Sequence, residues 1–262
     1  MGLQKKDKLN LLLRIFPEGI AAPSSWLVTQ GFSRQLVRRY MLSDRLIPLG
    51  HGVYARPSSP VHWDGVILGL QRLAGVPFHV GGISALNRLG FAHYLPLGGE
   101  PEIHVWGNAR VPAWVAAVKL PEKLVFHTGH LFDEDVRELS LTTIPTSTRD
   151  WTIQISTAER AMMEVLSLVD ETVASFSHAS ELFGGLTVLR PEVVSSLLTA
   201  CCSIKVKRLF LYFAEYYTHP WLKKVDRSRI DLGSGKRLVV RGGRLDKTYQ
   251  ITVPENLSAD RR

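Results

Sequence analysis

The chain has little cysteine, no long hydrophobic run and no recognisable export signal. Its two cysteines, Cys201 and Cys202, are adjacent, and two such residues make no disulfide framework. No apolar run approaches the roughly 20 residues that span a bilayer. The opening MGLQKKDKLN lacks the apolar core of a signal peptide and the sixth-position Ser or Thr of a myristoylation signal. We therefore expect a cytoplasmic protein that does not bind membranes.

Several enzyme motifs are also missing. Gly233-Ser234-Gly235-Lys236 suggests a Walker-type phosphate loop, but Ile230 stands where that loop needs its first glycine, and Arg237 stands where it needs Ser or Thr. The nine histidines and two cysteines show no zinc-ligand spacing, and no Gly-x-Ser-x-Gly elbow occurs. The sequence thus predicts no catalytic residue, no cofactor and no metal.

A DNA-targeted nuclease is the main enzymatic alternative, because winged-helix modules are often fused to nucleases. Metal-dependent nucleases usually hold their metal with an Asp and a later acid-x-Lys unit. Residues 61–262 contain no Asp-x-Lys or Glu-x-Lys triplet. The sequence therefore argues against a nuclease, which stays as an alternative function.

Charge is distributed unevenly along the 262 residues. Residues 1–60 carry 9 Lys and Arg against 3 Asp and Glu, residues 61–202 carry 9 against 15, and residues 203–262 carry 14 against 6. Two basic ends therefore flank an acidic centre. Each basic end is a candidate surface for a polyanion, although basic surfaces often serve only solubility.

The N-terminal segment has the pattern of a winged helix-turn-helix. Apolar spacing predicts a helix over 7–16. Pro23 opens a second helix that runs through Gln30 and stops at Gly31, a residue suited to a left-handed helix end. Ser33 is a good N-cap for a third helix. A hairpin pattern with a Gly50-His51-Gly52 turn follows directly.

The third helix has one apolar and one polar face. Leu36, Val37 and Tyr40 share the apolar face. The polar face carries long side chains whose hydrogen-bond donors suit base edges and phosphates, and the N-cap hydroxyl lies beside them. These candidate DNA contacts are Ser33, Arg34, Gln35, Arg38 and Arg39. His51 and Arg56 of the wing are further candidate DNA contacts, although His51 is equally well explained as an ordinary turn residue. The sequence therefore predicts binding to double-stranded DNA.

The remaining residues read as a mixed α/β domain. Helices are predicted over 63–75 and around 84–89, and strands over 102–106, 123–127 and 152–155. Ser156 and Glu159 form a capping-box sequence before a helix over 158–169. An aromatic-rich helix over 205–221 is expected to face a core. A terminal hairpin is expected to pair 236–241 with 249–253 around Gly242-Gly243. The fold class is thus α+β, with a winged helix-turn-helix over 1–60 and a mixed α/β domain over 61–262.

Three stretches together resemble the AbiEi-type antitoxins of AbiE-like type IV toxin–antitoxin systems. They are GFSRQLVRRYMLSDRLIPLGHGVYAR, ISTAERAMMEVL, and the C-terminal block from KVKRLFLYFAEYY to DKTYQITVP, the last being the most specific. The resemblance implies an antitoxin that binds inverted repeats in its own promoter and represses it. It also implies a nucleotidyltransferase-like toxin that is antagonised without a stable complex, and a part in phage defence.

Carried onto this chain, the resemblance places the DNA-contacting module at Arg34, Gln35, Arg38, Arg39 and the wing. It does not say which residues neutralise the toxin. The C-terminal cations are candidates only for a basic surface, comprising Lys205, Lys207, Arg208, Lys223, Lys224, Lys236, Arg237, Arg241 and Arg244. A winged-helix regulator without a toxin partner stays open as an alternative. So does a protein-interaction module whose acidic centre meets a basic partner.

Overall fold

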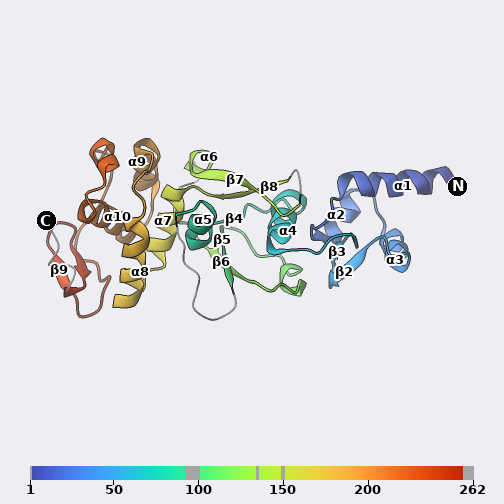
Figure 1. The fold of residues 1–262 in the computed structure, drawn as a ribbon, viewed down its shortest axis with the longest axis horizontal. Coiled ribbons are helices and arrows are strands. Elements are labelled where there is room, and N and C mark those ends of the chain that lie inside the picture. Colours follow the sequence, from blue (N-terminus) through green and yellow to red (C-terminus); the bar gives the residue numbers. More distant parts are fainter. Residues whose placement is uncertain (1, 92–100, 134–135, 149–150, 256–262) are drawn as a thin grey trace. The chain divides into compact units, whose positions relative to one another are not determined.

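The computed structural model describes residues 2–91, 101–133, 136–148 and 151–255, and the side chains from residue 7 onward (Figure 1). The chain forms two compact units. The first contains Met1–Val80, Pro96–Thr128 and Thr143–Ile155, and the second contains Gly81–Leu95, Gly129–Thr142 and Ser156–Arg262. A separate domain over 1–60 stays a prediction. No helix within the described ranges is long and apolar enough to cross a membrane.

The first unit begins with a winged helix-turn-helix. Its elements are α1 (Gly2–Ile15), β1 (Ala22–Pro23), α2 (Ser24–Thr29), α3 (Arg34–Leu42), β2 (Ile47–Gly50) and β3 (Val53–Ala55). The three strands form a small antiparallel sheet in the order β1-β3-β2. The predicted order of three helices followed by a hairpin is confirmed.

A five-stranded mixed sheet is drawn mainly from this unit. Its order is β6-β5-β4-β8-β7, formed by β4 (His79–Val80), β5 (Glu102–Gly107), β6 (Lys123–Thr128), β7 (Leu141–Pro145) and β8 (Thr152–Ser156). The three predicted strands are confirmed as β5, β6 and β8. Strand β4 has only two residues, and β7 is an edge strand that ends in Pro145, so neither shows clear alternation in the sequence.

Helix α4 (Trp63–Leu68), which continues as a π-helical turn over Gly69–Leu73, packs closely against the backbone before β1. A Cβ atom on Gly65 would lie 1.9 Å from the Gly19 carbonyl oxygen, and one on Gly69 would lie 2.1 Å from that of Ala21. The Ala21 amide also donates to the Gly65 carbonyl at 3.3 Å. The two glycines therefore permit a backbone-to-backbone contact that no larger residue fits.

Gly65→Ala is expected to lower the free energy of unfolding by about 1–3 kcal/mol, because backbone rather than a flexible side chain must move to admit the new methyl group. Chemical denaturation of wild type and variant would measure the loss of stability. Gly129→Ala is the matched control, since a Cβ atom there meets nothing within 4 Å. Equal stability of the two variants would show that the contact at Gly65 is not tight.

The second unit is mainly helical. Its elements are α5 (Gly82–Arg88), α6 (Arg137–Ser140), α7 (Ala158–Ser167), α8 (Val173–Gly184), α9 (Pro191–Ala200), α10 (Ile204–Tyr216), a 3-10 turn (Pro220–Lys224), β9 (Arg244–Asp246) and β10 (Ile251–Val253). The predicted aromatic core is confirmed, because Phe210, Tyr212 and Phe213 of α10 are buried and pack with Phe176 and Phe183 of α8. Cys201 and Cys202 are both free thiols.

The predicted terminal hairpin was wrong in its pairing. Strand β9 pairs antiparallel with β10, so Arg244 lies opposite Val253 and the turn lies over 247–250. Arg237 makes only an isolated bridge with Ile251. The Tyr249 amide donates to the buried Asp246 carboxylate at 2.8 Å, and this side-chain bond closes the turn. Aspartate side chains close turns as readily as glycine permits them. The Gly242-Gly243 pair was the stronger turn signal in the sequence, so the turn over 247–250 was not predicted.

The predicted capping box was also wrong. Thr157 is the N-cap of α7, and it makes no side-chain capping bond. Instead, the Ser156 hydroxyl donates to the Glu164 carboxylate at 2.8 Å. The Glu159 carboxylate accepts two hydrogen bonds from the Arg190 guanidinium, at 2.9 and 3.0 Å, and a third from the Arg190 amide at 3.0 Å. Ser156 therefore bonds a residue further along α7, and Glu159 bonds a residue beyond α8, so neither caps the helix start.

The pair of Glu159 and Arg190 predicts a dependence of stability on pH. Burial alone would raise the pKa of Glu159, but the hydrogen bonds from Arg190 outweigh it and hold the pKa below the ordinary value of 4.5. A depressed carboxyl pKa adds stability above the unfolded pKa and loses it as pH falls through the folded one. Unfolding measured from pH 6 down to pH 3 should therefore lose stability below about pH 4.5 in wild type. Arg190→Met should flatten that slope, and an unchanged slope would contradict the assignment.

Candidate nucleic-acid interface

The start of helix α3 and the turn before it are fixed by the local sequence. The Ser33 hydroxyl accepts from the Leu36 amide at 3.2 Å, which confirms Ser33 as the N-cap. Before it, Gly31 has φ of +79°, and the Phe32 amide donates to the Leu27 carbonyl at 2.9 Å, the Schellman arrangement that ends α2. The turn between the two helices is thus fixed by a glycine that tolerates positive φ.

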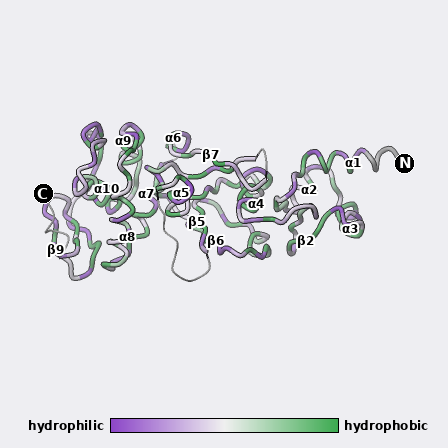
Figure 2. Tube along the Cα trace, in the orientation of Figure 1, coloured by the Kyte–Doolittle hydropathy of each residue, from purple (hydrophilic) through white to green (hydrophobic). Residues whose placement is uncertain are grey.

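The buried face of α3 anchors it to the module. Val37 and Tyr40 are buried, and the Tyr40 ring lies 6.4 Å from the ring of buried Phe32. Burial raises the pKa of Tyr40, while the nearby Arg39 partly opposes that shift, so Tyr40 is a neutral core residue. Lys8 of α1 lies over the other side of this cluster, 5.4 Å from the Phe32 ring centre. Figure 2 shows hydrophilic and hydrophobic residues mixed along α3, as expected for a helix with one packed face.

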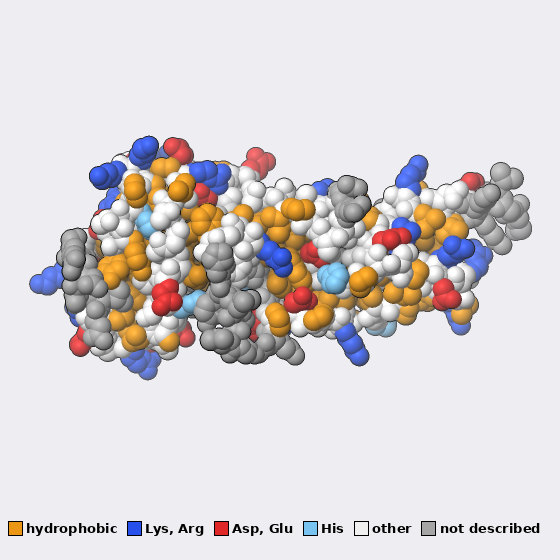
Figure 3. All heavy atoms as spheres, viewed as in Figure 1, with side chains coloured by type: hydrophobic (Ala, Val, Ile, Leu, Met, Phe, Trp, Pro, Cys, Tyr) orange, Lys and Arg blue, Asp and Glu red, His pale blue; other side chains and the backbone are white. Residues whose placement is uncertain are grey.

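The opposite face is cationic and open. Arg34, Gln35, Arg38 and Arg39 are all exposed. Among the described residues, no ion pair or side-chain hydrogen bond engages the guanidinium groups of the three arginines. In the space-filling view, cationic side chains gather where α3 lies (Figure 3). An unpaired guanidinium loses no intramolecular partner on meeting a phosphate or a guanine edge.

The two predicted wing contacts, His51 and Arg56, differ in their exposure. His51 is exposed in the tight turn between β2 and β3, beside Gly52 with φ of +75°. Arg56 is half-buried, because its guanidinium pairs with Glu18 at 2.8 Å and donates to the Phe16 carbonyl at 3.3 Å. Arg56 thus ties the end of the wing to the segment after α1. Arg45, an exposed cation just after α3, was not predicted as a DNA contact, because Asp44 beside it offsets its charge in the sequence.

The predicted C-terminal basic surface needs a correction. Lys207 and Arg208 are only 5% and 3% exposed, so they cannot belong to a surface. They lie on α10, where every residue from 206 to 214 is buried. Because this helix is buried on all sides, the spacing of its apolar residues does not mark the two cations as exposed. Lys205 is half-buried as well, and its ammonium donates to the carbonyls of Ser167 and Val169 at 3.2 and 2.8 Å.

The other predicted cations of this region differ in exposure. Lys223, Lys224 and Lys236 are exposed. Arg241 is exposed but pairs with Glu171 at 2.7 Å. Arg237 and Arg244 are half-buried. The exposed cations of the second unit are interspersed with acids in Figure 3 rather than gathered in one patch.

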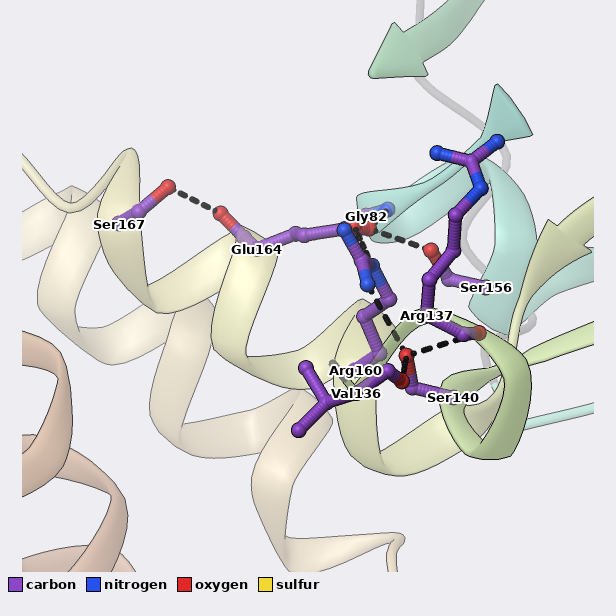
Figure 4. A network of polar contacts seen from close by, with 8 residues as sticks. All are labelled: Gly82, Val136, Arg137, Ser140, Ser156, Arg160, Glu164 and Ser167. Carbon is purple, nitrogen blue, oxygen red and sulfur yellow. Dashed lines mark hydrogen bonds and ion pairs between the residues drawn. The ribbon is translucent and has the colours of Figure 1, made fainter. Parts of the chain in front are cut away.

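Buried acids in the chain are committed to structural bonds. Asp64 accepts from the Gly65 amide at 2.9 Å and from the Ser147 hydroxyl at 2.9 Å. Glu164 is the centre of the polar network drawn in Figure 4. Within the described ranges, no group of three or more His, Cys, Asp or Glu is placed to hold a metal ion. These carboxylates therefore have structural partners that account for their burial.

Comparison with known proteins finds family matches over most of the chain. Residues 5–97 match a family described as the N-terminal domain of the AbiEi antitoxin transcriptional regulator. Residues 100–254 match a family described as a transcriptional regulator, the AbiEi antitoxin of a type IV toxin–antitoxin system. No curated protein matches the chain. The crystal structure of the RV2827C protein from Mycobacterium tuberculosis is 15% identical and has a TM-score of 0.48, over 94% of this chain and 89% of that one.

The two family matches together span nearly the whole sequence, and the boundary between them lies after α5 and before β5. The α3 helix with its wing lies inside the N-terminal match. The chain therefore belongs to the AbiEi family of antitoxin transcriptional regulators of type IV toxin–antitoxin systems.

Proposed function

We propose that this antitoxin represses its own operon by binding inverted repeats in the promoter. Helix α3 enters the major groove and the β2–β3 hairpin lies beside it on the DNA backbone. The observation that carries this proposal is the open cationic face of α3, where three arginines have no acidic partner within the described chain. A solubility surface would normally pair such cations with nearby acids.

Each residue of the face has a chemical role in this proposal. Arg38 and Arg39, on the exposed face, offer bidentate donors to guanine or to phosphate, and Gln35 has the donor and acceptor pair that adenine requires. Ser33 and Arg34 lie at the N-terminal end of α3, where the helix dipole favours a phosphate. His51 at the wing tip meets the backbone. Arg56 acts indirectly, by holding the wing through Glu18.

We further propose that the chain antagonises a nucleotidyltransferase-like toxin without forming a stable complex, with the region after residue 60 responsible. Membership of the antitoxin family supports an antagonistic role. Coexpression of the toxin and the antitoxin should restore growth, while affinity purification of the antitoxin should not retain the toxin. Retention of the toxin in a stoichiometric complex would contradict this mode of action.

The repressor proposal is tested by band shifts on the operon's upstream region. We expect binding at about 150 mM salt that is at least tenfold tighter than binding to a scrambled duplex of equal length, because specific and non-specific affinities typically differ by roughly 10³ or more. Equal affinity for both duplexes would contradict sequence-specific repression.

We also propose that the chain has no catalytic activity of its own. The support is that Asp64, Glu159 and Glu164 are buried and accept hydrogen bonds from neighbouring groups. Incubation of the protein with plasmid and Mg²⁺ or Mn²⁺ should leave the plasmid intact. Cleavage by the wild-type protein would revive the nuclease alternative.

A further inference from the structure

The exposed loop of Gly233, Ser234, Gly235 and Lys236 has an unusual backbone arrangement that the DNA interface does not explain. It follows the 3-10 turn and precedes the bridge between Arg237 and Ile251. Its sequence fails the Walker pattern, so any function must come from its conformation.

Buried Arg208 of α10 organises this loop from the inside. Its Nε donates to the Leu232 carbonyl at 2.8 Å, its Nη1 to the Gly235 carbonyl at 2.6 Å and its Nη2 to the Gly233 carbonyl at 3.1 Å. Nη1 also donates to the Gln250 carbonyl at 3.3 Å. One guanidinium therefore holds two of the loop's carbonyls, together with the Leu232 carbonyl before it, toward the core.

A second arginine holds the carbonyls in between. Nη1 of Arg237 donates to the Ser234 carbonyl at 3.2 Å and to the Lys236 carbonyl at 3.1 Å. Every carbonyl from 232 to 236 thus faces a guanidinium. Because a trans peptide directs its N–H opposite to its C=O, the amides that follow these carbonyls turn away from the arginines.

The amides on the outer side have no partner in the chain. The amides of Ser234, Gly235 and Lys236 donate to no group in the described ranges, while that of Gly233 donates to Asp231 at 2.7 Å. Gly233 and Gly235 have φ of +59° and +74°, whereas Ser234 between them has no positive φ. Successive amides in alternating right- and left-handed backbone are the arrangement that builds a nest, a concavity of amides that binds anions, and the φ values here follow that alternation.

We propose that the loop over 233–236 is a phosphate-binding site. The three free amides supply neutral donors, and the exposed Lys236 ammonium supplies a charge that can close over the bound group. Arg208 and Arg237, which face the carbonyls, add positive potential behind the nest. Asp231 lies beside the loop, and its Oδ1 accepts from the Gly233 amide.

The glycines explain why the site needs this composition. A Cβ atom on Gly233 would lie 3.2 Å from Ile204, and both glycines have left-handed φ that other residues adopt only with strain. Gly235 faces open space, since the nearest atom to an added Cβ is Arg237 Nη1 at 3.8 Å. The space beside the Gly235 α-carbon is therefore uncrowded.

Titration of the full-length, isotope-labelled protein with potassium phosphate tests the site by NMR. We expect saturable downfield shifts of the Ser234, Gly235 and Lys236 amides, which potassium chloride at matched ionic strength does not reproduce. Equal shifts with chloride, or no saturable shift at these three amides, would overturn the proposal.

Two variants locate the effect. Lys236→Gln should weaken phosphate binding roughly fivefold, the fold-change for losing about one exposed charge contact, while the three amides still shift. Gly235→Ala should abolish the shifts by straining the nest. Lys224→Gln removes an exposed lysine elsewhere in the same unit and should change nothing. An equal loss in Lys224→Gln would show diffuse attraction instead of a site.

The phosphate can come from a free anion or from a nucleic-acid backbone, and a second titration distinguishes them. A 12-base-pair duplex of scrambled sequence should shift the same amides if the source is the backbone. Shifts with inorganic phosphate alone would assign a free phosphate. The site does not involve α3, so an Arg38→Ala/Arg39→Ala variant should still bind phosphate. Failure of the phosphate proposal is therefore distinguishable from failure of the repressor proposal.

Discussion

Replacing Arg38 and Arg39 together with alanine is expected to weaken binding to the promoter duplex by about 2–4 kcal/mol, roughly 30- to 700-fold. Both side chains are exposed on α3, and neither has an ion-pair partner in the described chain. Their removal therefore costs no internal contact, and the whole loss falls on the complex. Band shifts or fluorescence anisotropy at fixed salt would measure it.

The salt dependence separates the two kinds of contact. If an arginine binds phosphate, its removal should flatten the slope of log K against log salt by about one unit and weaken specific and scrambled duplexes alike. If it reads a base edge, the slope is kept and discrimination between duplexes is lost. Single variants at each position assign the role of each residue.

Arg229→Ala is the matched control, because it removes one exposed arginine from the other unit. It should leave specific binding within about threefold of wild type, since only long-range charge is lost and it is screened over roughly 10 Å. Thermal unfolding should be unchanged in every variant. A control that loses as much affinity as Arg38→Ala would show that net charge, rather than the face of α3, governs binding.

The N-terminal module was predictable because its signals are local. Ser33 has the short hydroxyl that a helix start requires, and Gly31 tolerates the positive φ that ends α2. Four polar residues on one side of a nine-residue helix define a face whatever the rest of the chain does. The direction of that face therefore follows from helical geometry alone.

The second unit was less predictable because its decisive contacts are distant in sequence. Arg208 looks like a surface cation, but its partners are carbonyls 24 to 42 residues further on. The Glu159 partner is Arg190, which no local capping rule includes. The loop over 233–236 does not fit the Walker pattern, and its proposed anion site depends on carbonyl contacts that leave no sequence signature.

The network around Glu164 is another contact set that joins residues distant in the sequence. Glu164 on α7 is 1% exposed. One carboxylate oxygen accepts from the Gly82 amide at the start of α5 and from the Ser156 hydroxyl, both at 2.8 Å, and the other accepts from Arg160 Nε at 2.9 Å. Figure 4 shows how Arg160 extends the network to Ser140, to which it donates at 2.9 Å.

Glu164→Ala is expected to lower the free energy of unfolding by about 3–5 kcal/mol. The reason is that Arg160, whose side chain is only 13% exposed, keeps a charge with no carboxylate, and two further donors lose their acceptor. A domain of this size should lose roughly 10 °C in Tm. Glu181→Ala, an exposed acid on α8, is the control and should shift stability by less than about 0.5 kcal/mol.

A double variant separates the charge from the packing. Arg160→Met/Glu164→Leu removes both ions and keeps apolar volume, and Arg160 already stacks over Phe132 at 4.8 Å, so an apolar side chain fits that position. Replacing a buried pair in this way is often neutral or stabilising, whereas removing one partner leaves an uncompensated charge. The double variant should therefore recover at least half of the stability that Glu164→Ala loses. If the double variant is no more stable than Glu164→Ala, the unpaired charge of Arg160 is not the cause, and the lost bonds to Gly82 and Ser156 must account for the effect.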